Sequence, residues 1–124
     1  MQAQVKTVTT SDQHTLCVKT WGDEKKIPLV LVHGYPDNQE VWEPIIEQLV
    51  DDYYVVTYDV RGAGLSSIPK RIKDYRLPRL SLDLQAVVDQ VLPIRNFHMA
   101  AHDWGSLQSW ESATEPKLKG RLLS

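Results

Sequence analysis

The chain has 124 residues, of which 42% are hydrophobic and 24% charged, and its formal net charge is −2. This composition is that of one globular domain, which we place at residues 1–124, and it excludes a disordered or collagen-like chain. The pI is near 6.0, and Lys and Arg are spread along the chain. No nucleic-acid partner is therefore expected, because such proteins carry clustered positive charge. Binding to a membrane surface lacks the same electrostatic support.

Neither a membrane span nor a secretory leader is evident. The longest apolar run, Ile27–Val32, is far too short to cross a bilayer. The N-terminal residues lack the basic-then-apolar layout of a secretory signal, and the single Cys17 cannot close an internal disulfide. These features favour a reducing, cytoplasmic setting.

The first half of the chain predicts three kinds of element. Val5–Thr9 and Thr15–Thr20 alternate β-branched with polar residues on either side of a turn, which predicts an antiparallel pair of strands. Ile27–Val32 and Tyr53–Tyr58 are continuous apolar or aromatic runs, typical of parallel strands that are buried on both faces. Between them, apolar residues at helical spacing predict a crossover helix at Gln39–Val50.

The second half continues the alternation of helices and strands. Leu80–Val91 repeats the helical spacing, and a proline just beyond it acts as a stop. Asn96–Ala101 predicts a third buried strand, and Ser106–Thr114 predicts a further helix. This order indicates an α/β domain with a mostly parallel sheet and crossover helices.

The C-terminal residues suggest an interrupted pattern. Arg121–Leu123 could begin another strand, so the sequence reads as truncated after the helix predicted at Ser106–Thr114.

The most informative motif is Ala101-His102-Asp103-Trp104-Gly105, at the turn from a predicted strand into a predicted helix. It has the small-x-nucleophile-x-small form of a nucleophile elbow, with Asp103 in place of the usual serine. The flanking residues must be small because the central residue has a strained backbone. Taken alone, the motif leaves a second role open for Asp103, which is to cap the helix.

Two further motifs follow the ends of buried strands. His33-Gly34-Tyr35-Pro36 lies where this architecture supplies a backbone N–H group to an oxyanion hole. Asp59-Val60-Arg61-Gly62-Ala63-Gly64-Leu65-Ser66 ends the next strand. It fits a dinucleotide fingerprint poorly, because Ser67 stands where the third glycine is required.

Together the three motifs resemble those of the α/β-hydrolase superfamily, specifically its epoxide hydrolase branch. Residues 33–36 resemble the HGxP loop of that branch, residues 59–66 its DxRGxGxS loop, and residues 101–105 its GHDWG elbow. Ala101 replaces the usual glycine, which the requirement for a small residue tolerates, and Ser106 is a milder departure. The resemblance implies the N-terminal part of an α/β-hydrolase fold. The topology of that family would place the strand at Asn96–Ala101 next to the strand at Ile27–Val32 and leave it as an open edge of the sheet.

The resemblance also implies a two-step reaction. The Asp103 carboxylate would attack a carbon of a small hydrophobic epoxide, or of a related molecule, to form an alkyl ester that water then hydrolyses. The backbone N–H groups of Tyr35 and Trp104 would hold the oxyanion of the second step. Neither a cofactor nor a metal is implied. The residues expected to support the surrounding loops are His33, Gly34, Pro36, Asp59, Arg61, Gly62, Gly64, Ser66, Ala101, His102 and Gly105.

Structural roles are expected for the histidines. His33 is expected to pack within its loop, because a base that activates water must face the nucleophile. His98 and His102 share one face of a strand but have no evident third ligand for a metal. Trp104 could line a substrate cavity or serve in packing.

The sequence contains only part of a catalytic triad. In this superfamily the acid and the histidine follow the nucleophile along the chain, and no histidine follows Asp103. The base, its acid partner and the lid tyrosines are therefore expected outside these residues, and the 124-residue chain is expected to be inactive by itself. Some bacterial relatives continue into a short-chain dehydrogenase domain, which leaves room for a further domain C-terminal to Ser124.

Two other functions remain open. A haloalkane-type dehalogenase on the same scaffold would also use an aspartate nucleophile. Tyr35 and Trp104 count against it, because such enzymes carry a halide-binding Asn or an Arg at these positions. The third hypothesis is a truncated, non-catalytic hydrolase that acts as a binding module.

Overall fold

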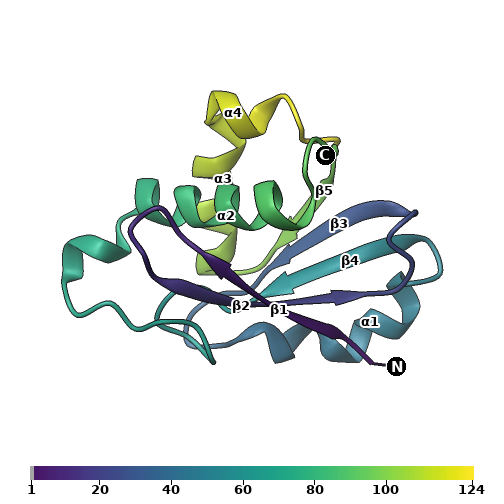
Figure 1. Cartoon of the computed structure of the whole chain (residues 1–124), viewed down its shortest axis with the longest axis horizontal. Coiled ribbons are helices and arrows are strands. Elements are labelled where there is room, and N and C mark those ends of the chain that lie inside the picture. The colour runs from purple at the N-terminus through teal and green to yellow at the C-terminus, as the bar shows by residue number, and fades with distance from the viewer. Residues whose placement is uncertain (1) are drawn as a thin grey trace.

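Five strands form one mixed sheet in the computed structural model, which describes residues 2–124 (Figure 1). In spatial order the sheet is β1-β2-β4-β3-β5. The strands are β1 (Gln4–Thr9), β2 (Thr15–Trp21), β3 (Ile27–Val32), β4 (Tyr53–Tyr58) and β5 (His98–Ala101).

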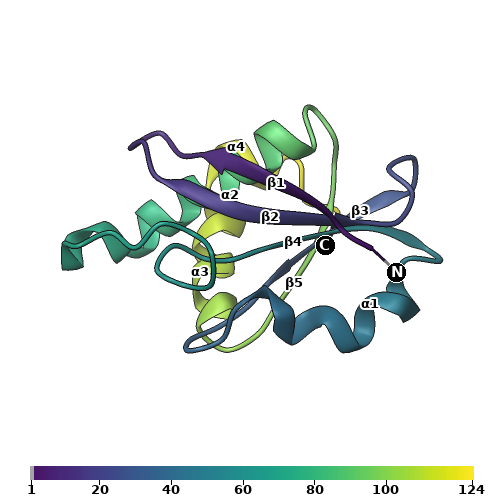
Figure 2. The same ribbon diagram turned by 60° about the horizontal axis from the view of Figure 1, so that its bottom comes forward.

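The helices are α1 (Glu43–Leu49), α2 (Leu77–Val91), α3 (Trp104–Thr114) and α4 (Pro116–Lys119), with 3-10 turns η1 (Gln39–Trp42) and η2 (Ile72–Tyr75). Helix α1 covers one face of the sheet, and α2, α3 and α4 lie on the other (Figures 1 and 2). Within the described residues, no helix has the length and apolar character needed to traverse a bilayer.

The predicted pairing of strands is confirmed. Strands β1 and β2 form an antiparallel hairpin, in which Thr9 lies opposite Thr15. Strand β3 is central and pairs in parallel with β4 on one side and β5 on the other. The parallel expectation holds for these three strands, whereas β2 joins β4 antiparallel, so the sheet as a whole is mixed. The buried apolar run of β3 matches its central place.

Several element boundaries differ from those predicted. The crossover helix begins as η1, where the Asn38 side chain accepts from the Glu40 N–H, and continues as α1 with Pro44 in its first turn. Helix α2 starts at Leu77, three residues earlier than expected, because Pro78 suits a first helical turn. Strand β5 starts at His98 and not at Asn96.

Two apolar layers hold the sheet between its helices. The larger one joins the sheet to α2 and includes Leu84, Val87 and Val88, all at most 2% exposed. The smaller one lies beneath α1 and includes Ile46. Together they hold the sheet in which β3 lies between β4 and β5, and the carboxyl ends of β3 and β5 carry two of the three motifs.

The expectation of an open edge at β5 is wrong for part of the strand. The Phe97 N–H donates to the Arg121 carbonyl and the Met99 N–H donates to that of Ser124, while the Leu123 N–H donates to the Phe97 carbonyl. Phe97 and Leu122 form a parallel bridge. The strand predicted to begin at Arg121 is therefore present as a short pairing segment along β5.

This pairing predicts a specific pattern of amide protection. In a chain that ends at Leu122, the Met99 amide loses its acceptor on Ser124, whereas the Phe97 amide keeps its acceptor on Arg121. Hydrogen exchange followed residue by residue should show faster exchange at Met99 and little change at Phe97. Equal acceleration at both amides, or none at Met99, would contradict the described pairing.

Candidate active site

Asp103 sits at the turn from β5 into α3 with a backbone conformation of φ 56° and ψ −128°. Residues other than glycine rarely adopt a positive φ, and they do so mainly where the surrounding structure compensates the strain. The Asp103 side chain makes no capping hydrogen bond to the helix, so the capping role left open by the sequence is not adopted. The carboxylate is exposed at the start of α3.

Two glycines allow the elbow to pack closely against the loop after β3. A Cβ atom placed on Gly105 would lie 2.4 Å from the carbonyl oxygens of both Val32 and His33. A Cβ atom on Gly34 would lie 2.7 Å from the Cβ atom of Asp103. The small residues thus bring the HGxP-like loop and the elbow into direct contact.

His33 lies within this packing and is 2% exposed. Its Nε2 atom accepts a hydrogen bond from the Val60 N–H at 2.9 Å, and its Nδ1 atom is 2.9 Å from the Gly34 carbonyl oxygen. The ring therefore carries its proton on Nδ1. It joins the HGxP-like loop, residues 33–36, to the loop after β4, residues 59–66, which is called the second loop below. In this arrangement both ring nitrogens are occupied by loop contacts.

Asp59 organises the second loop. Its carboxylate accepts hydrogen bonds from the backbone N–H groups of Gln39 and Leu65, and its carbonyl accepts one from the Ser66 hydroxyl. Ser66 in turn accepts from the Cys17 N–H. A Cβ atom on Gly64, which has φ +49°, would overlap the Asp59 carboxylate, so this loop closes tightly around a buried acid.

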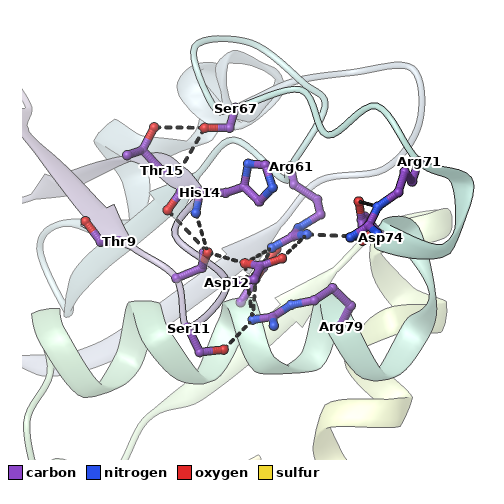
Figure 3. A network of polar contacts seen from close by, with 12 residues as sticks. Thr9, Ser11, Asp12, His14, Thr15, Arg61, Ser67, Arg71, Asp74 and Arg79 are labelled. Carbon is purple, nitrogen blue, oxygen red and sulfur yellow. Dashed lines mark hydrogen bonds and ion pairs between the residues drawn. The ribbon is translucent and has the colours of Figure 1, made fainter.

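The Arg61 side chain enters a buried ionic network with Asp12 (Figure 3). Its side chain is 0% exposed. It binds Asp12 in the β1–β2 turn through two 3.0 Å hydrogen bonds and Asp83 on α2 through two more. The hydrogen bonds from Arg61 hold the pKa of Asp12 well below its usual range. The network fixes the second loop to the hairpin turn and to α2.

A cavity of about 760 Å³ lies between the two loops and the start of α3. This volume is within the range of small-molecule sites. Of the predicted site residues it is lined by His33, Gly34, Tyr35, Pro36, Arg61, Gly62, Gly64 and Trp104. Asp103 adjoins this lining through its neighbour Trp104 and its contact with Gly34.

The oxyanion candidates have free donors. Within residues 2–124, the backbone N–H groups of Tyr35 and Trp104 donate to no protein atom. Both residues line the cavity. Of the two side chains, that of Tyr35 is the more exposed.

Other predicted residues lie farther from the cavity. Asp59 and Ser66 are buried behind the second loop, and Ala101 is half-buried at the end of β5. His98 lies 2.7 Å from the Ser124 hydroxyl, and His102 is exposed. No three His, Cys, Asp or Glu side chains converge on one point among the described residues.

The sequence analysis missed part of the cavity wall. Tyr75, Leu77 and Leu80 come from η2 and α2, and Gln108 comes from α3. Tyr75 and Leu77 precede the apolar periodicity that begins at Leu80, so no periodic signal marks them. Gln108 lies one helical turn after Trp104, so the i, i+4 spacing from the elbow could have pointed to it.

Comparison with known proteins assigns the family. The family model for the alpha/beta hydrolase fold matches residues 27–117, and the chain belongs to this family. It is 38% identical over 96 residues to "Probable oxidoreductase EphD" of Mycobacterium bovis, which covers 77% of this chain and 16% of that protein. It is 32% identical over 107 residues to "Epoxide hydrolase 1" of Caenorhabditis elegans, covering 86% of this chain and 26% of the nematode protein.

Solved structures give the same result. Epoxide hydrolase A from Mycobacterium thermoresistibile superposes with a TM-score of 0.82 at 33% identity, covering 90% of this chain and 35% of that one. Epoxide hydrolase VrEH1 from Vigna radiata superposes with a TM-score of 0.85 at 26% identity, covering 94% and 37%. The chain therefore spans well under half the length of these relatives and is an epoxide hydrolase-like member of the α/β-hydrolase family.

The buried network predicts a large cost for removing Arg61. In Arg61→Met, the Asp83 carboxylate stays buried without its bidentate partner, so the free energy of unfolding should fall by about 3 to 5 kcal/mol. Arg71, whose side chain is 66% exposed and pairs with Asp74, provides the matched control. Arg71→Met should cost less than about 1 kcal/mol. Urea unfolding measures both, and equal losses would contradict the assigned role of the network.

The close approach at the elbow predicts a second contrast. Gly105→Ala forces a methyl group onto two carbonyl oxygens and should lower the free energy of unfolding by at least about 2 kcal/mol. Gly120→Ala makes the same chemical change where nothing lies within 4 Å, so stability should stay within about 0.5 kcal/mol. Thermal or urea unfolding of the two variants tests this. If both changes were equally tolerated, α3 would not be held against the loop as described.

Proposed function

We propose that this chain carries the nucleophile of an epoxide hydrolase-like reaction. In it the Asp103 carboxylate attacks a ring carbon of a small hydrophobic epoxide to form an ester, while the ring C–O bond breaks and the released oxygen takes a proton from water. The observation that carries the proposal is the strained backbone of Asp103, held at the elbow by Gly34 and Gly105. A carboxylate suits displacement at an alkyl carbon, whereas a serine at this point would suit an acyl carbon.

The surroundings of Asp103 support both chemical steps. The N-terminus of α3 points its backbone N–H groups, and the positive end of the helix dipole, towards the elbow. The free N–H groups of Tyr35 and Trp104 are suited to hold the oxyanion that forms when water attacks the ester carbonyl. The oxyanion hole then serves the carboxyl group of the enzyme, since the substrate has no carbonyl.

The second step needs a base that these residues do not supply. Water must be activated on the side opposite the nucleophile, yet His33 is engaged in loop contacts and no histidine follows Asp103. Loss of a general base costs a factor of roughly 10² to 10⁴. We therefore propose that the 124-residue chain forms the ester slowly and does not turn over.

Intact-mass measurement after prolonged incubation with excess styrene oxide tests this proposal. The chain should gain the mass of one substrate molecule, and peptide mapping should place the adduct on Asp103. Asp103→Asn should prevent the adduct, whereas Asp51→Asn, a control at another exposed carboxylate, should leave it unchanged. An adduct that persists in Asp103→Asn would refute the assignment of the nucleophile.

The same assay separates the remaining alternatives. A chloroalkane of similar size in place of the epoxide should leave the mass unchanged, and a faster adduct with the chloroalkane would favour the dehalogenase. If neither reagent modified Asp103 although the chain was folded, the non-catalytic binding module would be the better hypothesis.

A further inference from the structure

The segment between β4 and α2 projects from one end of the molecule (Figures 1 and 2, teal). Residues 68–76, called here the cationic tip, contain η2. Ile68 is 71% exposed and Ile72 is 92% exposed. Exposed apolar side chains that gather in one place can mark a site of contact with a protein or a membrane. Leu65, on the approach to the tip, is also largely exposed.

The same tip concentrates positive charge. Lys70, Arg71, Lys73 and Arg76 are all exposed, and Asp74 is the single acidic residue among them. Asp74 is paired with Arg71. The chain as a whole has a net charge of −2, so the tip is a positively charged segment of a chain that is negatively charged overall. The expectation that Lys and Arg are spread along the chain is wrong for this segment, because net charge conceals a local cluster.

The arrangement of these side chains narrows the class of partner. The projecting tip combines two exposed aliphatic side chains with four exposed cations within nine residues. Binders of single-stranded nucleic acid offer aromatic stacking platforms, whereas the one aromatic residue of the tip, Tyr75, is half-buried and donates to the Pro69 carbonyl. Amphipathic surfaces with this composition bind the interface of anionic membranes.

We propose that the cationic tip is a peripheral contact for an anionic lipid surface, with Ile68 and Ile72 entering the acyl boundary and the four cations facing the headgroups. The contact is independent of the chemistry at Asp103. Tyr75 also lines the cavity, so a chain bound through the tip would hold the mouth of the cavity close to the lipid.

Vesicle co-sedimentation of the 124-residue chain tests this proposal. The chain should bind vesicles made of equal parts phosphatidylcholine and phosphatidylglycerol, and should bind pure phosphatidylcholine at least about tenfold more weakly. Binding should fall in roughly 1 M NaCl, where charges are screened beyond about 3 Å. Equal binding to the two kinds of vesicle would overturn the proposal.

Paired variants separate the tip from the rest of the surface. Lys70→Glu/Lys73→Glu and Ile68→Ser/Ile72→Ser should each reduce binding at least about tenfold. The matched controls, Lys25→Glu/Lys117→Glu and Ile94→Ser, alter exposed residues elsewhere and should bind normally. All of these positions are exposed, so unfolding midpoints should not change.

Two outcomes would point to other partners and reject this one. Loss of binding in Trp110→Ser, with normal binding in Ile68→Ser/Ile72→Ser, would place the lipid contact on α3. Tighter binding to a DNA duplex than to anionic vesicles, unaffected by Ile68→Ser/Ile72→Ser, would assign the cations to nucleic acid.

Discussion

The closeness of α3 to the loop after β3 is the constraint on which the candidate site depends. Gly105 lies directly against the carbonyl groups of Val32 and His33, and Gly34 lies against Asp103. With larger residues at these points the helix would move outward, and Asp103 could relax from its positive φ. The strain at Asp103 is therefore maintained by packing, which is supplied in turn by the central position of β3 between β4 and β5.

A second set of contacts secures the opposite wall of the cavity by charge. The buried Arg61 joins the β1–β2 turn to α2 through Asp12 and Asp83. Burial by itself would lower the pKa of Arg61, but the hydrogen bonds that Arg61 donates to the two carboxylates raise it above its usual value. Arg61 thus remains a cation and holds the loop in one position. Steric fit therefore holds one wall of the cavity in place, and ion pairs hold the other.

The sequence predicts most of the fold because its strands have unambiguous patterns. The buried run of β3 and the alternating hairpin need no information from distant residues. Boundaries set by prolines, as at Pro44 and Pro78, shift by a few residues because a proline suits the first turn of a helix without marking its start.

The candidate site is only partly visible in the sequence. The strain at Asp103 could be expected from the small residues around it, and the place of Gly34 followed from its motif. The roles of Asp12 and Asp83 could not be foreseen, since nothing local links a hairpin turn to the middle of a helix. The apolar wall from Tyr75 and Leu77 depends on how the segment after β4 folds back, which no periodic pattern encodes.

The order of strands also affects how the chain is made. Strand β3 is synthesised early, but its partner on one side, β5, begins only at His98. During translation the edge of β3 that pairs with β5 therefore stays unpaired until residues 98–101 have been synthesised. Contacts between segments so far apart in the sequence form slowly. Unpaired apolar edges of this kind are sites of misassembly. The strand edge that later supports Asp103 is thus open to misassembly until β5 has been synthesised.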